Sequence, residues 1–410
     1  MKISLITYGC KVNQAEAQKW EKFLTSNGYN VTENPEEAEL WVINTCAVTK
    51  KAEIQSKQII NKAKKLGKKA FVTGCYVELC KFENNLENLK FFSNSEKDNI
   101  FKNFENLNKS KTLKISRHRA IVKIQDGCNQ YCSYCIVPYL RGKPRSYSIE
   151  QIIGEIKDYQ SIGIKEVILS GINIGLYGID YENNMNLKRL LKVILKETSG
   201  IRIRLSSIEV NHIDDEFIEV LSDRRICRHL HIPLQHGSDR ILQLMNRSYN
   251  VSLYEDTIEK IFKLYPDISI GTDIIVGFPS ETEEDFKTTL KLIEKMEFSY
   301  LHVFPYSKRP FTKASEINED IPENTKKERT NALIELGKIK KEKYIKKFIG
   351  CSLEVLIENK KNGFFSGTSE NYIKCLIDDK KELLILGDIF KVRVDFTDGQ
   401  YAFATVINNQ

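Results

Sequence analysis

Residues 120–135 of the chain read Ala120-Ile-Val-Lys-Ile-Gln125-Asp-Gly-Cys128-Asn-Gln-Tyr-Cys132-Ser-Tyr-Cys135. Its first six residues are typical of a buried β-strand, and three cysteines follow directly. Three thiolates can hold three irons of a four-iron cluster, which leaves the fourth iron open to a substrate or cosubstrate. A zinc knuckle would need a fourth ligand, and the nearest candidate, His118, precedes the strand. The motif therefore predicts an iron–sulfur site at the end of a strand.

The bulk composition sets broad limits. A chain of 410 residues, with 41% hydrophobic and 29% charged residues, predicts two or three globular domains. It has no apolar stretch of about 18 residues, so we expect no contact with a membrane. Residues Met1–Thr7 are typical of a strand rather than a signal peptide, so the ten cysteines are expected to be reduced, in the cytoplasm. The net charge of +7 is compatible with RNA binding but is weak evidence alone.

The quoted strand opens a series of strand-like segments separated by helical stretches. The predicted strands are Ala120–Gln125, Glu166–Leu169, Arg202–Ser206, Leu230–Leu234, Ser269–Gly277 and Tyr300–Phe304. Helical stretches between them include Glu150–Ser161, Leu187–Glu197 and Glu283–Met296. Six βα units predict an incomplete (β/α)6 barrel, because eight units would need more chain.

The sequence on either side of this predicted barrel indicates two further domains. We therefore expect an α/β fold with three domains, at 1–110, 117–345 and 346–410. The first predicts a parallel sheet, with strands at Ile3–Tyr8, Leu40–Asn44 and Ala70–Thr73 and helices at Asn13–Ser26 and Lys50–Leu66. The polar segment Asn103–Ser116 is expected to be a linker. After a lysine-rich helix, Glu323–Phe348, a small antiparallel β-barrel is expected from strands at Ser352–Ile357, Tyr372–Ile377, Glu382–Ile385 and Phe390–Phe396.

A second set of cysteines lies in the N-terminal part. Cys10, Cys46 and Cys75 each follow a predicted strand directly. Because parallel strands end at one edge of a sheet, these three thiols should converge and could hold a second cluster with an open iron. The alternative is that they are small buried side chains. Cys80 is a rival to Cys75, which we prefer because Gly74 lets the backbone approach a cluster closely.

Several motifs together resemble the radical S-adenosylmethionine (SAM) methylthiotransferases. They are Tyr8–Gln14, Asn44–Cys46, Thr73–Tyr76, Ile124–Cys128, His231–Gln235, Met245–Arg247 and Gly271–Pro279, and the resemblance covers nearly the whole chain. It implies an N-terminal auxiliary-cluster domain, a radical SAM barrel and a C-terminal TRAM-like β-barrel. Segments Gly171–Gly178 and His302–Ser307 look most like the branch that modifies N6-threonylcarbamoyladenosine at position 37 of tRNA.

Three positions depart from the family pattern. Phe311 stands where the family usually has Gly, Lys313 where it has Pro, and His236 where it has Ser. All three lie near ends of predicted barrel strands. The departures therefore bear on the shape of the substrate loop and on details of the SAM pocket.

The resemblance also implies cofactors and roles. Two [4Fe-4S] clusters are expected, one on Cys128, Cys132 and Cys135 and one on Cys10, Cys46 and Cys75. One SAM would methylate a sulfur on the auxiliary cluster, and another would yield the radical that removes hydrogen from C2 of adenine. The predicted SAM contacts are Tyr134, Ser170, Gly171, Glu209 and Gln235, with a solvated loop carboxylate as the alternative for Glu209. Asp273 is either a pocket residue or a partnered core carboxylate.

The expected partners are the anticodon loop of tRNA and a low-potential electron donor, and the protein is expected to be a monomer. Cations flanking the cluster loop are the candidate RNA contacts, namely Arg117, Arg119, Arg141, Lys143 and Arg145. Lysines of the helix Glu323–Phe348 are either a further RNA surface or a solvated charged face.

Three alternative functions stay open. One is methylthiolation of an aspartate on a ribosomal protein, and another is action on isopentenyladenosine in tRNA. The third is an iron–sulfur RNA-binding protein without catalysis. The three-cysteine motif opposes the third alternative, because a merely structural cluster would take a fourth thiolate.

Overall fold

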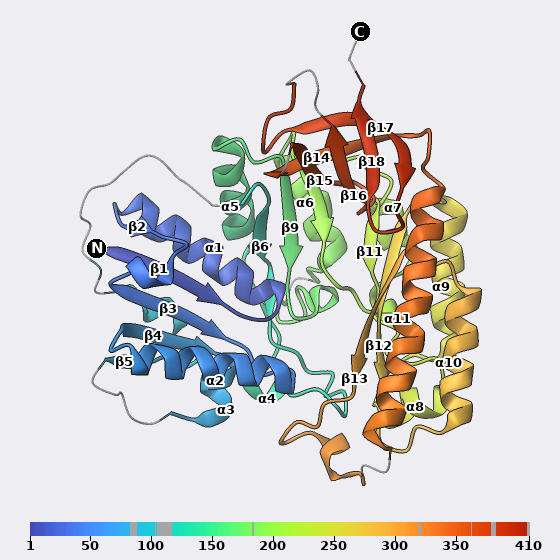
Figure 1. Ribbon diagram of the computed structural model, residues 1–410, viewed down its shortest axis with the longest axis horizontal. Coiled ribbons are helices and arrows are strands. Elements are labelled where there is room, and N and C mark those ends of the chain that lie inside the picture. The colour runs from blue at the N-terminus through green and yellow to red at the C-terminus, as the bar shows by residue number, and fades with distance from the viewer. Residues whose placement is uncertain are drawn as a thin grey trace.

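The computed structural model describes residues 1–82, 88–102, 104, 117–182, 184–318, 321–361, 363–378 and 383–407. Along the chain these residues form an N-terminal sheet, a set of six central strands, and a C-terminal barrel (Figure 1). None of the described helices is both long enough and apolar enough to cross a membrane.

The N-terminal sheet is parallel throughout, as the sequence predicts. Its strands are β1 (Lys2–Thr7), β2 (Asn30–Val31), β3 (Leu40–Thr45), β4 (Lys69–Gly74) and β5 (Leu89–Phe91), in the order β2-β1-β3-β4-β5. The helices are α1 (Lys11–Ser26), α2 (Lys50–Lys65) and α3 (Cys75–Cys80). Strand β3 is buried along its whole length, which explains its apolar run Leu40–Ile43. The edge strands β2 and β5 were not predicted, because two or three residues carry little periodic signal.

All six predicted central strands are present and parallel. They form two sheets, one of β6 (Ala120–Lys123), β9 (Glu166–Ser170) and β10 (Arg202–Leu205), and one of β11 (His229–His231), β12 (Ser269–Val276) and β13 (Tyr300–Pro305). The covering helices are α5 (Ile149–Ser161), α6 (Leu187–Glu197), α7 (Asp215–Val220), α8 (Asp239–Leu244), α9 (Val251–Leu264) and α10 (Glu283–Lys295). An isolated parallel bridge joins Ile203 on β10 to Ile226, which lies in the segment that leads into β11.

The N-terminal part contacts β6 and the segment that follows β13. On β6, Gln18 of α1 accepts a hydrogen bond from the Ile121 N–H at 2.7 Å and donates to the Arg119 carbonyl at 3.1 Å. After β13, Arg309 donates to the Ala47 carbonyl at 3.1 Å. Helix α1 therefore satisfies the edge of β6 with a side chain instead of a further strand.

The C-terminal strands pair in a closed ring. After α11 (Glu323–Lys346) come β14 (Ser352–Lys361), β15 (Phe364–Ser369), β16 (Lys374–Asp378), β17 (Ile389–Thr397) and β18 (Ala402–Val406), closed in the order β14-β15-β16-β18-β17. The predicted wholly antiparallel pairing is wrong, because β16 and β18 are parallel. The predicted strand Glu382–Ile385 is also wrong over Leu383–Ile385, its described part. Strands β15 and β18 were missed because Ser, Gly and Ala weaken their strand signal.

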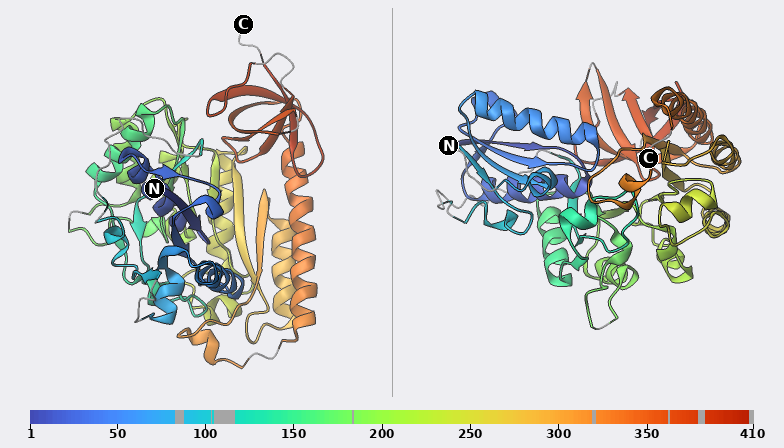
Figure 2. Two further views of the ribbon diagram at one scale, coloured as in Figure 1. Left: turned by 60° about the vertical axis from the view of Figure 1, so that its left-hand side comes forward. Right: turned by 90° about the horizontal axis from the view of Figure 1, so that it is seen from below.

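Helix α11 runs along the side of the molecule opposite the N-terminal sheet (Figure 2). Its Lys338 and Lys346 pair with Glu335 at 2.6 Å and Glu342 at 2.7 Å on the same helix. Lys343 and Lys347 both pair with Glu297. This pairing favours the interpretation of a solvated charged face over that of an RNA surface. The predicted linker Asn103–Ser116 lies outside the described residues, except for Phe104, which packs against Tyr29 at a ring-centroid distance of 5.1 Å.

Candidate active site

The Cys128–Cys135 loop follows β6 through a tight turn. Gly127 has a φ of +74°, and a Cβ there would lie 2.1 Å from the Lys143 carbonyl oxygen, so no other residue fits without a shift. The loop is anchored on the end of α8, because the Ser133 N–H donates to the Met245 carbonyl at 2.9 Å. Burial raises the pKa of Cys135 to about 12 and also raises that of Cys128. Such thiols are neutral until a metal displaces the proton.

Arg247 is a site residue to which the sequence assigned no role. Its guanidinium donates to the Cys132 sulfur at 3.0 Å and to the Tyr134 hydroxyl at 3.4 Å. It also forms a partly buried ion pair with Glu209, one of the predicted SAM contacts. The arginine therefore places positive charge beside the cluster loop and fixes the Glu209 carboxylate. Arg247 ends the motif Met245–Arg247, which contributed to the family resemblance, but the motif alone does not show which groups the arginine contacts.

The ends of β9 and β10 present buried polar atoms that lack partners. Among the described residues, Ser170 Oγ, Ser206 Oγ and Asn173 Nδ2 have no hydrogen-bond partner. A Cβ on Gly171 would lie 2.9 Å from Gln125 Oε1, so the backbone passes close to that side chain. Unpaired buried polar groups are costly without a ligand. This edge therefore fits a polar cofactor with amino, carboxylate and ribose groups, as SAM has.

Gln235 and Asp273 lie together on the second central sheet. The Gln235 backbone pairs with that of β12, accepting from the Ile275 N–H at 2.8 Å, and its φ is +67°. Asp273 lies 2.9 Å from His231 Nε2 and 3.2 Å from His302 Nδ1, measured from Oδ1. It is therefore a partnered carboxylate, and hydrogen bonds from the two histidines hold its pKa well below the usual range against the effect of burial.

The three departures from the family pattern lie in different settings. His236 is buried and lies 3.2 Å from Glu281, and its Nδ1 accepts from the Ser238 N–H at 3.0 Å, so it belongs to the core. Phe311 is 60% exposed with a φ of +67°, a conformation that explains a usual Gly at this position. Lys313 begins the short 3-10 helix Lys313–Glu316.

The N-terminal cysteines converge as predicted from their strand ends. Cys10 precedes α1, Cys46 follows β3, and Cys75 begins α3. A Cβ on Gly9 would lie 2.6 Å from the Cys46 sulfur, which shows how closely the loops approach. Burial, together with the nearby Cys75 and Cys10 sulfurs, raises the pKa of Cys46 to about 11. The rival Cys80 lies at the opposite end of α3, on the exposed surface.

A five-residue helix, α4 (Val137–Arg141), joins the two cysteine sets. It begins two residues after Cys135, and its Leu140 packs in the N-terminal core with Cys75. Its last residue, Arg141, donates to Asp126 at 3.0 Å and to Glu16 at 3.2 Å. Although burial favours the neutral form, the Cys75 sulfur and these carboxylates keep the pKa of Arg141 above its usual value. The two cysteine sets are thus one short helix apart.

Comparison with known proteins agrees with this geometry. Residues 122–293 match the radical SAM superfamily, and residues 2–93 match the uncharacterized protein family UPF0004. The chain is 37% identical to the threonylcarbamoyladenosine tRNA methylthiotransferase MtaB of Aquifex aeolicus, over 93% of this chain and 98% of the relative. It is 33% identical to the tRNA-2-methylthio-N(6)-dimethylallyladenosine synthase of Fervidobacterium nodosum, over 90% of each chain. The chain belongs to the radical SAM methylthiotransferase family.

A solved structure supports the fold of this methylthiotransferase. The radical SAM methyltransferase TsrM of Kitasatospora setae superposes with a TM-score of 0.56 over 76% of this chain and 74% of its own, at 12% identity. Membership of the radical SAM superfamily implies SAM and one [4Fe-4S] cluster. The Cys128–Cys135 loop, with the unpaired polar atoms at the ends of β9 and β10, fits that pair of cofactors.

Two of the predicted RNA contacts of the methylthiotransferase are wrong. Arg141 is buried, with a side chain 1% exposed, and its donors are taken up by Asp126, Glu16 and Asn13. Arg119 pairs with Glu358 of the C-terminal barrel at 2.6 Å. Both arginines hold parts of the molecule together, and the buried Arg141 is not available to phosphates. The other three candidates, Arg117, Lys143 and Arg145, are exposed.

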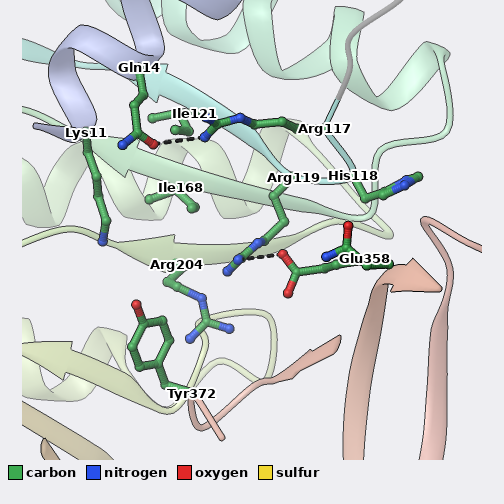
Figure 3. Close-up of a pocket in the computed structure, with 11 residues that line it drawn as sticks. Lys11, Gln14, Arg117, His118, Arg119, Ile121, Ile168, Arg204, Glu358 and Tyr372 are labelled. Atoms are coloured by element: carbon green, nitrogen blue, oxygen red, sulfur yellow. Dashed lines mark hydrogen bonds and ion pairs between the residues drawn. The ribbon is translucent and has the colours of Figure 1, made fainter. Parts of the chain in front are cut away.

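A cavity of about 350 Å³ lies where the three parts of the methylthiotransferase meet (Figure 3). It is lined by Lys11, Gln14, Arg117, His118, Arg119, Ile121, Ile168, Arg204, Glu358, Asn359 and Tyr372. Four of these side chains are cationic and one is a carboxylate. Burial, helped by Arg204 and Arg119, lowers the pKa of Lys11 to about 8. The cavity was not foreseen, because its residues come from distant parts of the chain.

Proposed function

We propose that this enzyme adds a methylthio group to C2 of N6-threonylcarbamoyladenosine at position 37 of tRNA. The observation that carries the proposal is the placement of two converging cysteine sets at the two ends of α4. One set is suited to a cluster that binds SAM, and the other to an auxiliary [4Fe-4S] cluster that bears sulfur. Relatives named for this substrate match over most of both chains, which supports the choice of base.

The roles of single residues follow from this arrangement. Cys128, Cys132 and Cys135 would hold the SAM cluster, and Cys10, Cys46 and Cys75 the auxiliary cluster. With both groups bound, the cofactors supply an organic radical that can take the C2 hydrogen and a methylated sulfur that replaces it. A radical is needed because no side-chain base is strong enough to remove that hydrogen.

The protein supplies position and the exclusion of water. Ser170 and Gly171 at the end of β9 would contact the amino group of SAM, and Tyr134 its adenine. Gln235 would contact the ribose or carboxylate, and Glu209, held by Arg247, would do so from the opposite sheet. Arg247 would also stabilise the negative charge of the Cys132 thiolate.

The three parts correspond in this proposal to three functional units, at 1–110, 117–345 and 346–410. The first would carry the auxiliary cluster and the second would bind SAM. The closed C-terminal strands would act as a TRAM-like RNA-binding barrel. The exposed Arg117, Lys143 and Arg145 would steer the anticodon loop toward the cluster loop. A low-potential electron donor is required, and the enzyme would act as a monomer in the cytoplasm.

Cysteine variants of anaerobically reconstituted protein test the two clusters. The Cys10/Cys46/Cys75 triple-Ala variant should keep about half of the iron and sulfide of the unmodified protein. Cys132→Ala should abolish reductive cleavage of SAM, whereas Cys46→Ala should spare cleavage and stop methylthio transfer. If the triple variant keeps all of its iron, the auxiliary cluster is not on these residues. The matched control is Cys375→Ala, in the core of the C-terminal barrel.

Mass spectrometry of tRNA nucleosides tests the substrate. Cells that lack the protein should lose 2-methylthio-N6-threonylcarbamoyladenosine and regain it on expression of the chain. The 33% identity to dimethylallyladenosine synthases makes the isopentenylated base the second candidate. Loss of only the 2-methylthio-isopentenyl nucleoside would establish that candidate instead. If no tRNA nucleoside changes, a ribosomal-protein substrate becomes the explanation.

A further inference from the structure

We propose that the three-part cavity binds the carboxylate of the threonylcarbamoyl group, and that Lys11 is the cation which recognises it. The inference rests on the proposed function, because it names the residue that would distinguish threonylcarbamoyladenosine from other bases at position 37. It assigns a specificity role to a residue outside the cluster loops.

The cations that line the cavity differ in whether they already have a hydrogen-bond or ion-pair partner in the protein. Arg119 is paired with Glu358 at 2.6 Å. Arg204 is saturated, because it donates to both oxygens of Glu166 and to the Ser369 carbonyl at 2.9 Å. Lys11 has no hydrogen bond or ion pair with any described residue, and its side chain points into the cavity (Figure 3). A partly buried cation without a partner is unfavourable, so an anionic ligand would complete the site.

Lys11 lies between the cavity and the proposed auxiliary cluster, where C2 of the adenine would react. Lys11 directly follows Cys10, a proposed ligand of the auxiliary cluster. Gln14, three residues further along α1, lies on the same helix face and accepts from Arg117 at 2.9 Å. A base that presents C2 to the cysteines would carry its N6 substituent past this face, because C2 and C6 both adjoin N1 in adenine. The carboxylate at the end of that substituent would then reach Lys11.

The walls of the cavity favour a base substituent over a backbone phosphate. Ile121 and Ile168 contribute apolar surface on the side of the central strands. A phosphate is linked to two riboses and would draw both into the cavity, whereas the threonyl group ends in a free carboxylate and a methyl group. The charge of the substituent therefore suits Lys11, and its methyl group suits the isoleucines.

Binding of synthetic anticodon stem-loop RNA to the reconstituted enzyme tests this assignment. Three RNAs would be compared, with threonylcarbamoyladenosine, its methyl ester, or unmodified adenosine at position 37. The unmodified enzyme should bind the free acid about 10- to 100-fold more tightly than the ester, the range for a charge-assisted hydrogen bond. Lys11→Met should remove that preference and leave binding of the unmodified RNA within about twofold. Lys11→Arg should keep most of the preference for the free acid.

Lys19→Met is the matched control, because Lys19 is an exposed lysine on the same helix, α1. It should behave like the unmodified enzyme, and iron content should be equal in all variants. Equal weakening of all three RNAs by Lys11→Met would show that Lys11 binds a phosphate, which overturns the assignment. A preference for the free acid that survives Lys11→Met overturns it too. If the unmodified enzyme shows no preference and does not convert the free acid, the proposed function itself fails.

Discussion

At the scale of single residues, one buried carboxylate connects the central strands to the C-terminal barrel. Glu166 on β9 is fully buried and accepts from Arg202 at 2.6 Å and Arg204 at 2.8 Å. The same arginines donate to barrel carbonyls, among them Thr368 at 3.0 Å. Burial would raise the pKa of Glu166, but Arg204 and Arg202 hold it far below its usual range. The carboxylate is therefore charged in the folded protein at neutral and mildly acidic pH.

This depressed pKa predicts a loss of stability in acid. The unfolded carboxyl binds a proton near pH 4.3, so the contribution of Glu166 is complete above that pH and declines as pH falls below it. Glu166→Gln should destabilise the protein at pH 7 by about 3 kcal/mol, because Arg202 and Arg204 lose their charged partner. The difference from the unmodified protein should shrink below about pH 4. Thermal unfolding between pH 7 and pH 3 measures this stability difference. The control is Glu328→Gln, at an exposed position on α11. A difference that is constant with pH would contradict the prediction.

Phe311 allows a second test at this scale. A left-handed conformation costs a residue with a Cβ about 1–2 kcal/mol, and glycine avoids that cost while losing some entropy on folding. Phe311→Gly should therefore stabilise the protein by about 1 kcal/mol, because the exposed ring gives up little buried surface. Phe311→Ala removes the same ring but keeps the Cβ, and it should be neutral. Denaturant unfolding distinguishes them; equal stability of the two variants would show that strain at φ +67° is negligible.

At the scale of elements, a lysine from α11 stabilises the end of a neighbouring helix. Lys340 is buried and donates to the carbonyls of Glu294 and Met296, the latter at 2.7 Å, at the C-terminus of α10. A cation there satisfies free carbonyls and complements the helix dipole. Lys340 therefore stabilises the contact between α10 and α11, a role that the lysine-rich sequence of α11 does not indicate.

Removing this contact should loosen the packing of the two helices. Lys340→Met leaves two carbonyls facing the hydrophobic stem of the new residue, and it should cost about 2 kcal/mol of stability. Lys338→Met on the same helix removes only an exposed pair with Glu335 and should cost less than about 0.5 kcal/mol. Both values come from urea unfolding at pH 7. Similar costs for the two variants would mean that the carbonyl contacts contribute nothing.

At the scale of the whole molecule, some cations are paired with acids inside the protein, whereas others are exposed and free to attract RNA. Arg141 and Arg119 lie between parts of the chain and are paired with acids. Lys143 and Arg145 are exposed beyond the cluster loop, on the segment that follows α4. Electrostatic attraction of RNA would therefore depend on the second pair.

Salt dependence of tRNA binding tests this separation. The double variant Lys143→Glu/Arg145→Glu should weaken binding and reduce the slope of log affinity against log salt by about one to two. Cleavage of SAM without RNA should be unchanged. Lys287→Glu/Lys291→Glu on the outer helix α10 makes the same change in net charge and should leave the slope as it is. Equal effects of the two variants would mean that only total charge matters.

The amino-acid sequence by itself determined the main elements, both cysteine sets and the family. Helix α6 matches its predicted bounds and α10 begins where predicted, because their apolar periodicity is local. Helix α11 also begins at its predicted residue, directly after Pro322. Convergence of Cys10, Cys46 and Cys75 was predictable as well, since parallel strands end at one edge. Tertiary structure alone decided which charged residues are buried. Arg141, Arg247 and Lys11 occupy chemically distinct settings that depend on partners far away in the chain, and no local pattern encodes those contacts.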